Sequence, residues 1–454
     1  MTYFFETYGC QMNTAESAAL DLVCRERGWK KAPDGESADL VLLNTCSVRK
    51  TAEQRALGRL ALYASLKKKR NAAGRPLVLV AAGCMAQRLG GSLLERFSVD
   101  YVMGTRSRSL FPQILEAAER GARGEAAAPV EEGEEPVFSF SSSHLEEGSF
   151  RSFIPIMHGC NNFCSYCIVP YVRGPEISRS PRGVVNEMKL AAEKGIREIT
   201  LLGQNVNSYR WEGGDGFSSM DFPGLLRLVA GELDPRKGNP IRWVRFLSAN
   251  PGDFSSETIR IMAENGVFCR HIHLPVQHGS NRILKAMNRR YTREQYLSLA
   301  GEIRRAMPEM TFSTDILVGF PGETGDDLEE TLDLMNEVRF LYAYMYHYNP
   351  REGTAACDLP GRVAEDVKRE RLSRVIALQK KHTAELLKSR IGFRERVLIE
   401  GISRKNADEL ISRTERDEMA AAAGKASLIG TFAELTLSGL AGNTFRARDL
   451  VSIE

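Results

Sequence analysis

The sequence predicts an α/β protein with an N-terminal open parallel sheet, a central partial (β/α)6 barrel and a small C-terminal all-β barrel. Short apolar runs alternate with helical patterns over residues 1–119, and the alternation resumes over 151–390. Such alternation is typical of parallel sheets whose strands are joined by helices. Residues 391–454 return to short strands, as in small β-barrels. Residues 120–150 are rich in small and acidic residues, and we expect a linker there.

The composition is that of a globular protein with sizeable cores. Hydrophobic residues make up 43% of the 454 residues, and the formal net charge is only +3. This charge does not by itself demand a nucleic-acid partner. The first residues lack a signal-peptide pattern and no apolar run could span a bilayer, so we expect a soluble, cytoplasmic protein without a membrane partner. Nine cysteines, an odd number, fit ligands and buried thiols better than a disulfide framework.

Three cysteines follow three predicted strands of the N-terminal part. Cys10, Cys46 and Cys84 each come just after an apolar run. Because the carboxyl ends of parallel strands meet at one edge of a sheet, these cysteines should lie together. Three buried thiols that act as small hydrophobes are the alternative; a cluster-binding set with one iron free of protein ligands is the preferred interpretation. The predicted strands are 3–8, 39–44 and 76–82, and the predicted helices are 15–27, 51–70 and 89–97.

Six further strands are predicted in the central part. Pro181 suits the first position of a helix, and Thr292 with Gln295 forms a capping box at another helix start. A partial (β/α)6 barrel is favoured over a closed Rossmann-type sheet because a cysteine-rich loop follows the first strand, where barrel sites lie. The six predicted strands are 153–157, 198–206, 243–249, 271–277, 311–320 and 341–348.

That loop contains Cys160, Cys164 and Cys167, separated by three and then two residues. Thiolates are the usual ligands of iron–sulfur clusters. Three of them in one short loop can hold a cubane whose fourth iron stays open for a cofactor. A structural zinc site is the alternative, but it would need a fourth ligand from elsewhere. Disulfides are disfavoured because three cysteines cannot all pair.

The other strand ends of the central part are polar or rich in glycine. Each could be only a turn, but together around one rim they favour a cofactor pocket, in which glycine lets the backbone approach a ligand. Tyr166, inside the cysteine loop, could contact the same cofactor or pack beneath the loop. The candidate cofactor-binding residues are Tyr166, Gln204, Asn205, Ser248, Gln277, Gly319 and Glu323.

The C-terminal part begins with a helix over 362–390 in which Lys and Arg outnumber acids. The simplest interpretation of these charges is a helix face exposed to solvent, and a stripe that faces RNA is the alternative. Four short strands should then form a small barrel of oligonucleotide-binding style. The run Met419–Ala423 is a poor strand by propensity, because alanine is depleted in strands. The predicted strands are 396–403, 409–414, 428–437 and 445–451.

On its motifs the chain resembles the tRNA methylthiotransferases of the MiaB type over essentially its full length. The Cx3Cx2C loop is the signature of radical S-adenosylmethionine (SAM) enzymes. The resemblance implies an N-terminal methylthiotransferase domain, a central radical SAM barrel and a C-terminal TRAM domain, which is an RNA-binding module. The matching segments are Tyr8–Asn13, Asn44–Arg49, Gly83–Gln87, Gly159–Tyr171, His273–Gln277 and Asp315–Thr324.

The resemblance implies two 4Fe-4S clusters with three cysteine ligands each. Cys160, Cys164 and Cys167 would be catalytic, since their cluster would reduce SAM to a deoxyadenosyl radical. The cluster on Cys10, Cys46 and Cys84 would carry sulfur methylated by another SAM. Radical chemistry of this kind belongs to cofactors rather than side chains. The implied partners are a tRNA with dimethylallyladenosine beside the anticodon, a sulfur donor, and a flavodoxin- or ferredoxin-type reductant, and the implied oligomeric state is a monomer.

Two other functions stay open at the level of sequence. One is the same chemistry on threonylcarbamoyl adenosine in tRNA or on a ribosomal-protein aspartate. Relatives that modify the ribosomal protein usually read Gly-Cys-Pro-Lys-Asn where this chain has Gly9-Cys-Gln-Met-Asn13, which favours prenylated adenosine. The other is a ferredoxin-like electron carrier, which would not need a pocket of SAM size.

Overall fold

The computed structural model describes residues 1–47, 50–121, 148–234 and 238–453. The chain forms two compact units, which we call the N-terminal and C-terminal units. The first comprises Met1–Glu146, Met157–Asn161 and Cys167–Arg179, and the second comprises Glu147–Ile156, Asn162–Tyr166 and Ser180–Glu454. Most of the expected linker over 120–150 lies outside the described residues. Within the described ranges, no helix is both long and apolar enough to cross a bilayer.

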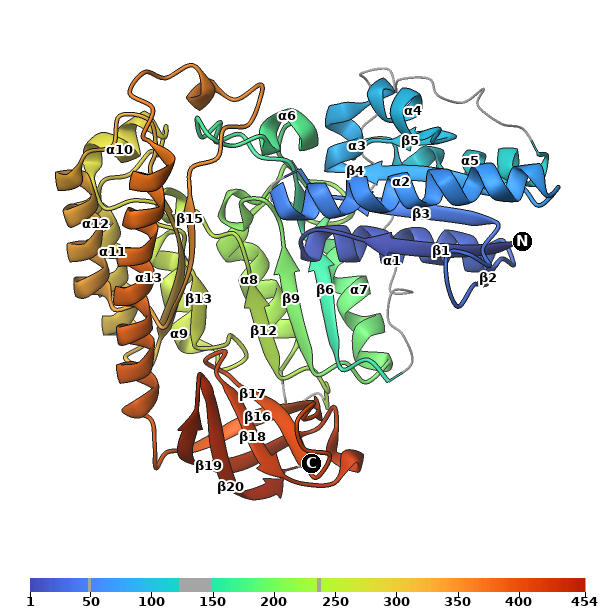
Figure 1. The fold of residues 1–454 in the computed structure, drawn as a ribbon. Helices are drawn as coiled ribbons and strands as arrows, with labels where there is room; N and C mark the ends of the chain where they lie inside the picture. Colours follow the sequence, from blue (N-terminus) through green and yellow to red (C-terminus); the bar gives the residue numbers. More distant parts are fainter. Residues whose placement is uncertain (48–49, 122–147, 235–237, 454) are drawn as a thin grey trace. The chain divides into compact units, whose positions relative to one another are not determined.

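The N-terminal unit contains a five-stranded parallel sheet in the order β2-β1-β3-β4-β5 (Figure 1). This confirms the predicted open α/β sheet. Its central strands are buried on both faces, as expected for apolar runs in a parallel sheet. The strands are β1 (Thr2–Thr7), β2 (Lys30–Lys31), β3 (Leu40–Thr45), β4 (Val78–Gly83) and β5 (Tyr101–Met103).

Among the residues that the structure describes, five α-helices accompany this sheet. The predicted helix over 89–97 corresponds to α4 (Gly91–Phe97), and a separate short helix, α3 (Cys84–Leu89), precedes it, with Gly90 at a φ of 46° between the two. The helices are α1 (Gln11–Glu26), α2 (Lys50–Ala72), α3 (Cys84–Leu89), α4 (Gly91–Phe97) and α5 (Phe111–Glu119). The segment over 167–179 adds α6 (Val169–Arg173), and β7 (Met157–His158) pairs with β8 (Ile177–Ser178).

In the C-terminal unit, all six predicted central strands are present and run parallel. They form two ladders, β12-β9-β6 and β13-β14-β15, which meet through a bridge between Val244 and Phe268. We call these six strands the half-barrel (Figure 1). They are β6 (Arg151–Pro155), β9 (Glu198–Leu202), β12 (Trp243–Phe246), β13 (His271–His273), β14 (Thr311–Val318) and β15 (Tyr342–His347).

Helices follow the strands of the half-barrel. Pro181 begins the first of them, as predicted. The Thr292 capping box is also present, with the Thr292 N–H donating to Gln295 Oε1 at 2.8 Å. The helices are α7 (Pro181–Glu193), α8 (Phe222–Glu232), α9 (Ser256–Glu264), α10 (Asn281–Ala286), α11 (Arg293–Ala306), α12 (Gly325–Val338) and α13 (Glu365–Lys388). A short hairpin, β10 (Arg210–Trp211) with β11 (Met220–Asp221), precedes α8.

The tail closes into a five-stranded barrel in the order β16-β17-β18-β20-β19. Met419–Ala423, a poor strand by propensity and absent from the four predicted strands, forms β18. These residues pair with β17 on one side and β20 on the other, and three of the four alanines are buried. Barrel closure therefore outweighs the low propensity of alanine. The strands are β16 (Arg394–Ile402), β17 (Glu409–Thr414), β18 (Met419–Ala423), β19 (Phe432–Ala441) and β20 (Thr444–Ser452).

Candidate functional site

The three strand-end cysteines of the N-terminal unit follow neighbouring strands. Cys10 caps α1 after β1, Cys46 follows β3, and Cys84 begins α3 after β4. Two glycines permit the close approach of these ends. A Cβ on Gly9 would lie 2.8 Å from the Cβ of Cys46, and one on Gly83 would lie 2.5 Å from the Thr45 carbonyl oxygen. Only glycine avoids these clashes, so both positions keep the cysteine-bearing ends packed together.

The chemistry of this edge suits an iron–sulfur cluster. All three thiols are free of disulfides, and Cys46 and Cys84 are buried. Burial raises the pKa of Cys84 to about 11, and the neighbouring sulfurs of Cys46 and Cys10 act in the same direction. Within the described residues, no three His, Cys, Asp or Glu side chains converge on a single metal ion. A cubane does not require this, because its thiolates bind different irons.

A buried ionic cluster lies in the same unit. Glu16 on α1 forms ion pairs through its Oε1 with Arg173 Nη1 at 2.7 Å and with Arg108 Nη1 at 3.2 Å. Both Glu16 and Arg173 are almost fully buried. Arg173 Nη1 also lies 3.4 Å from His158 Nδ1. This cluster could not be predicted from the sequence, because nothing local links α1 to a residue 157 positions later.

The ends of the predicted cysteine loop belong to the N-terminal unit. The Cys160 N–H donates to the Gly174 carbonyl at 3.1 Å, and the Asn161 N–H donates to Glu176 Oε1 at 3.2 Å. After Cys167, Ile168 and Val172 pack against Cys84 in a small apolar cluster. The residues that flank the loop are therefore tied to the edge of the N-terminal sheet.

The middle of the loop belongs to the C-terminal unit. Arg289 Nη1 lies 3.3 Å from Cys164 Sγ. The Asn288 side-chain amide donates to the carbonyl oxygens of Asn162 and Phe163 at 3.2 and 2.9 Å. These contacts come from the turn after α10, and no sequence pattern connects that turn with the loop. A guanidinium beside a thiolate is a favourable neighbour for a cluster ligand.

The predicted cofactor-binding residues lie at the ends of adjacent strands of the half-barrel. Ser248 and Gln277 have positive φ values of 65° and 69°, and Gly319 has 69°. A backbone hydrogen bond links two of these strand ends, because the Val206 N–H donates to the Ser248 carbonyl at 3.3 Å. Gln204 and Asn205 follow β9, and the Asn205 side-chain amide donates to Asp253 at 2.8 Å, whereas its Oδ1 is buried with no partner among the described residues. The rim thus offers strained backbone and an amide oxygen to a ligand.

Two of the candidate cofactor-binding residues make contacts within the protein instead. Glu323 is buried, its Oε1 lies 2.8 Å from Arg371 Nη1, and its Oε2 receives the Phe320 N–H at 3.1 Å. Tyr166 is partly buried against the apolar cluster that contains Ile283 and Phe320. Both side chains support the loops of the rim.

One face of β13, β14 and β15 carries polar and aromatic residues that the sequence analysis did not assign. His273 Nδ1 lies 3.0 Å from Ser313 Oγ, and its Nε2 lies 3.5 Å from Asp315 Oδ2. The ring of His273 also packs edge-on against Tyr344, at 5.6 Å between centroids. The period-2 alternation of strands explains this shared face, but the matching residues on three strands become visible only once their register is known.

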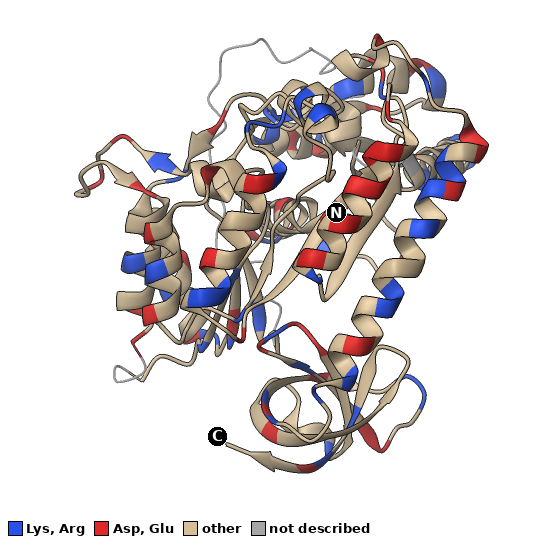
Figure 2. Ribbon diagram, turned by 90° about the vertical axis from the view of Figure 1, so that its left-hand side faces the viewer, with Lys and Arg blue, Asp and Glu red and all other residues tan. Residues whose placement is uncertain are grey.

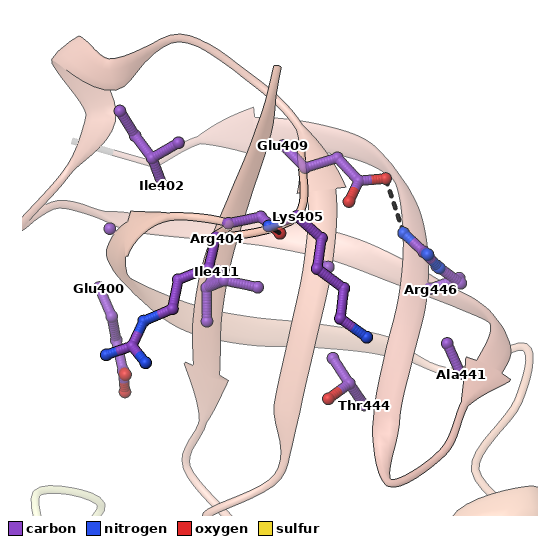
Figure 3. Close-up of a pocket in the computed structure, with 12 residues that line it drawn as sticks. Glu400, Ile402, Arg404, Lys405, Glu409, Ile411, Ala441, Thr444 and Arg446 are labelled. Carbon is purple, nitrogen blue, oxygen red and sulfur yellow. Dashed lines mark hydrogen bonds and ion pairs between the residues drawn. The ribbon is translucent and has the colours of Figure 1, made fainter. Parts of the chain in front are cut away.

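The C-terminal barrel has a hollow of its own, with a volume of about 510 Å³. Arg404 and Lys405 extend across it, while Glu409 pairs with Arg446 at 2.6 Å (Figure 3). Among the described residues, no carboxylate pairs with Arg404 or Lys405. Elsewhere, the helices in the view of Figure 2 carry both basic and acidic residues, whereas α12 carries only acidic ones.

Comparisons with known proteins place this geometry in a family. The model of the Radical SAM superfamily matches residues 154–335, and that of the Uncharacterized protein family UPF0004 matches residues 2–104. A tRNA-2-methylthio-N(6)-dimethylallyladenosine synthase of Treponema pallidum is 49% identical over 98% of each chain. The chain belongs to this synthase family. Synthases of the same name from Treponema denticola and Bacteroides fragilis are 48% and 41% identical, over 98% and 99% of this chain and 99% and 96% of theirs.

Solved structures support the fold of this family member. The radical S-adenosylmethionine methyltransferase TsrM of Kitasatospora setae aligns with a TM-score of 0.56 at 16% identity, over 76% of this chain and 74% of that one. The cobalamin-dependent radical enzyme OxsB aligns at 0.51 and 12% identity, over 84% of this chain and 56% of that one. These likenesses confirm the radical SAM architecture predicted from the sequence.

Proposed function

We propose that this chain is a radical SAM methylthiotransferase that converts dimethylallyladenosine in tRNA to its 2-methylthio form. The observation that carries the proposal is the pair of three-cysteine sets, one at the edge of a parallel sheet and one in a Cx3Cx2C loop. The full-length likeness to synthases of that name supports the choice of substrate.

The reaction explains the need for cofactors. The proton on C2 of adenine is not acidic, and C2 carries no leaving group. General acid–base catalysis, which accelerates a reaction by roughly 10²–10⁴-fold, is therefore too weak. Cys160, Cys164 and Cys167 would hold one 4Fe-4S cluster, and Cys10, Cys46 and Cys84 the other. When bound, these clusters and SAM supply the radical, the sulfur and the methyl group.

The chain's own residues orient these groups. Arg289 holds the middle of the loop at Cys164, while the backbone of Ser248, Gln277 and Gly319 lines the rim where SAM would bind. Gln204 and Asn205 add side-chain amides at the same rim. The proposal includes a cytoplasmic monomer, a flavodoxin- or ferredoxin-type reductant and a sulfur donor.

An assay with two readouts distinguishes a methylthiotransferase from an electron carrier. The full-length protein, reconstituted anaerobically, should cleave SAM reductively and form methylthiolated nucleoside in tRNA that carries dimethylallyladenosine. The triple variant Cys10→Ala, Cys46→Ala, Cys84→Ala should keep SAM cleavage and lose the methylthio product. An electron carrier would show neither activity. Loss of SAM cleavage in a folded triple variant would contradict the division of roles between the two sites.

A further inference from the structure

Two arginines, of which Arg173 is buried and Arg108 is partly buried, share one buried carboxylate in the N-terminal unit. The Glu16 carboxylate receives Arg173 at 2.7 Å and Arg108 at 3.2 Å, and Glu16 and Arg173 are 2% and 3% exposed. Two guanidiniums against one carboxylate leave an excess of positive charge.

This excess charge lies next to the strand-end cysteines. Burial opposes the charge of Arg173, but the nearby Cys84, Glu16 and Cys10 more than offset it, so the net shift in its pKa is upward. The apolar cluster of Cys84, Ile168 and Val172 holds the helix α6 in place, and Arg173 is the last residue of α6. A hydrogen bond from Thr105 to the Val172 carbonyl fixes the same turn.

A Glu–Arg pair that serves only to join two segments needs one arginine. Here the helix that carries Glu16 is also fixed to the strand end that precedes Cys46. The Asn13 side-chain amide donates to Asn44 Oδ1 at 2.9 Å, and the Asn44 side-chain amide donates to Ser17 Oγ at 3.0 Å. These bonds between α1 and the end of β3 therefore position Glu16, and with it the Arg173 guanidinium, relative to the strand-end cysteines.

We propose that Arg173, positioned by Glu16, supplies the positive charge that raises the reduction potential of the cluster held by Cys10, Cys46 and Cys84. The inference rests on the proposed function, which assigns a cluster to these cysteines. Net charge near an iron–sulfur cluster is one of the determinants of its potential. A buried cation stabilises the more negative, reduced state most strongly, because the interior screens charges weakly. Arg173 is a positioning and tuning residue and does not bind the cluster itself.

The test uses full-length protein with Cys160, Cys164 and Cys167 changed to Ala, so that the only expected cluster is the one on the sheet edge. Arg173→Met in this background should shift the midpoint potential of that cluster to a more negative value and change its electron paramagnetic resonance spectrum. Arg173→Lys keeps the charge and should stay closer to the parent. In Arg173→Met, Glu16 keeps Arg108 as a partner, which limits the damage to folding.

Arg120→Met is the matched control, because Arg120 lies in the same unit and its side chain is 68% exposed. It should leave the potential unchanged. Loss of the cluster in Arg173→Met but not in Arg173→Lys also supports the charge role. An unchanged potential in a fully loaded Arg173→Met protein, or equal loss in the Met and Lys variants, overturns it. If the parent variant binds no iron, the proposed function itself fails, and the inference fails with it.

Discussion

Trp243 at the start of β12 packs edge-on against Phe432 at the start of β19, with 4.9 Å between the ring centroids. Polar contacts surround this pair within the C-terminal unit. Arg245 donates to the carbonyl oxygens of Glu415 and Thr414 at 3.0 and 3.1 Å, and Arg151 pairs with Glu400 at 2.6 Å. The C-terminal barrel is therefore docked on the half-barrel, and its removal would expose a buried tryptophan.

We expect Phe432→Ala to lower the stability of the C-terminal unit. Phe432 is fully buried, and truncation of a buried phenylalanine costs about 3–5 kcal/mol. The urea midpoint of full-length protein measures this loss. Phe393→Ala is the matched control, because Phe393 is 52% exposed in the same barrel. Equal midpoints for the two variants would show that the Trp243–Phe432 contact does not support docking.

Iron content should divide equally between the two cysteine sets. Anaerobically reconstituted protein should bind about eight irons, as two four-iron clusters. Either triple alanine variant should bind about four irons, since each set would hold one cluster. Changing Cys24, which is buried in the core of the N-terminal unit, to Ala should leave the iron content unchanged. A Cys10, Cys46, Cys84 triple variant with full iron content would contradict the second cluster.

Recognition of tRNA should depend on the hollow of the C-terminal barrel. Arg404 and Lys405 are exposed beside it, and each phosphate contact changes the slope of log affinity against log salt by roughly 0.7–0.9. Arg404→Ala with Lys405→Ala should weaken tRNA binding and flatten the salt dependence by up to two contacts, with SAM cleavage unaffected. Arg448→Ala, whose guanidinium already faces Asp449 at 3.5 Å, should have a smaller effect. Unchanged affinity and slope in the double variant would move recognition to the other parts of the chain.

The stability of the barrel should fall as the pH rises toward neutrality, because of Glu418. Burial raises the pKa of this carboxyl to about 7; Glu395 and Asp417 add to the shift, and Arg390 and Thr414 oppose it. A raised folded-state pKa stabilises the protein below the unfolded value of about 4.3, and this contribution is lost as the pH rises through the folded value.

Glu418→Gln cannot ionise, so the variant should gain stability relative to wild type between about pH 5 and about pH 8. Urea midpoints of both proteins at the two pH values measure this gain. Glu409→Gln, at a residue paired with Arg446 at the barrel surface, is the control and should not show it. Parallel pH profiles for wild type and Glu418→Gln would contradict the raised pKa.

The sequence predicted the parts of the site that follow from local patterns. Cys10, Cys46 and Cys84 could be placed at one edge because each follows an apolar strand, and strand ends converge in a parallel sheet. The contact of Arg289 with Cys164 could not be predicted, because it joins residues 125 positions apart. The same holds for Arg173 and Glu16, and β18 was missed because barrel closure overrode the propensity of its alanines.

The central claim is most directly tested by nucleoside mass spectrometry of tRNA. Cells that lack the protein should accumulate dimethylallyladenosine, and re-expression of the wild-type chain should restore the 2-methylthio form. Re-expression with Cys10→Ala, Cys46→Ala and Cys84→Ala should leave dimethylallyladenosine unmodified. Two results would contradict the account. One is dimethylallyladenosine that stays unchanged while methylthiolation of threonylcarbamoyl adenosine is restored, and the other is no change in any tRNA nucleoside.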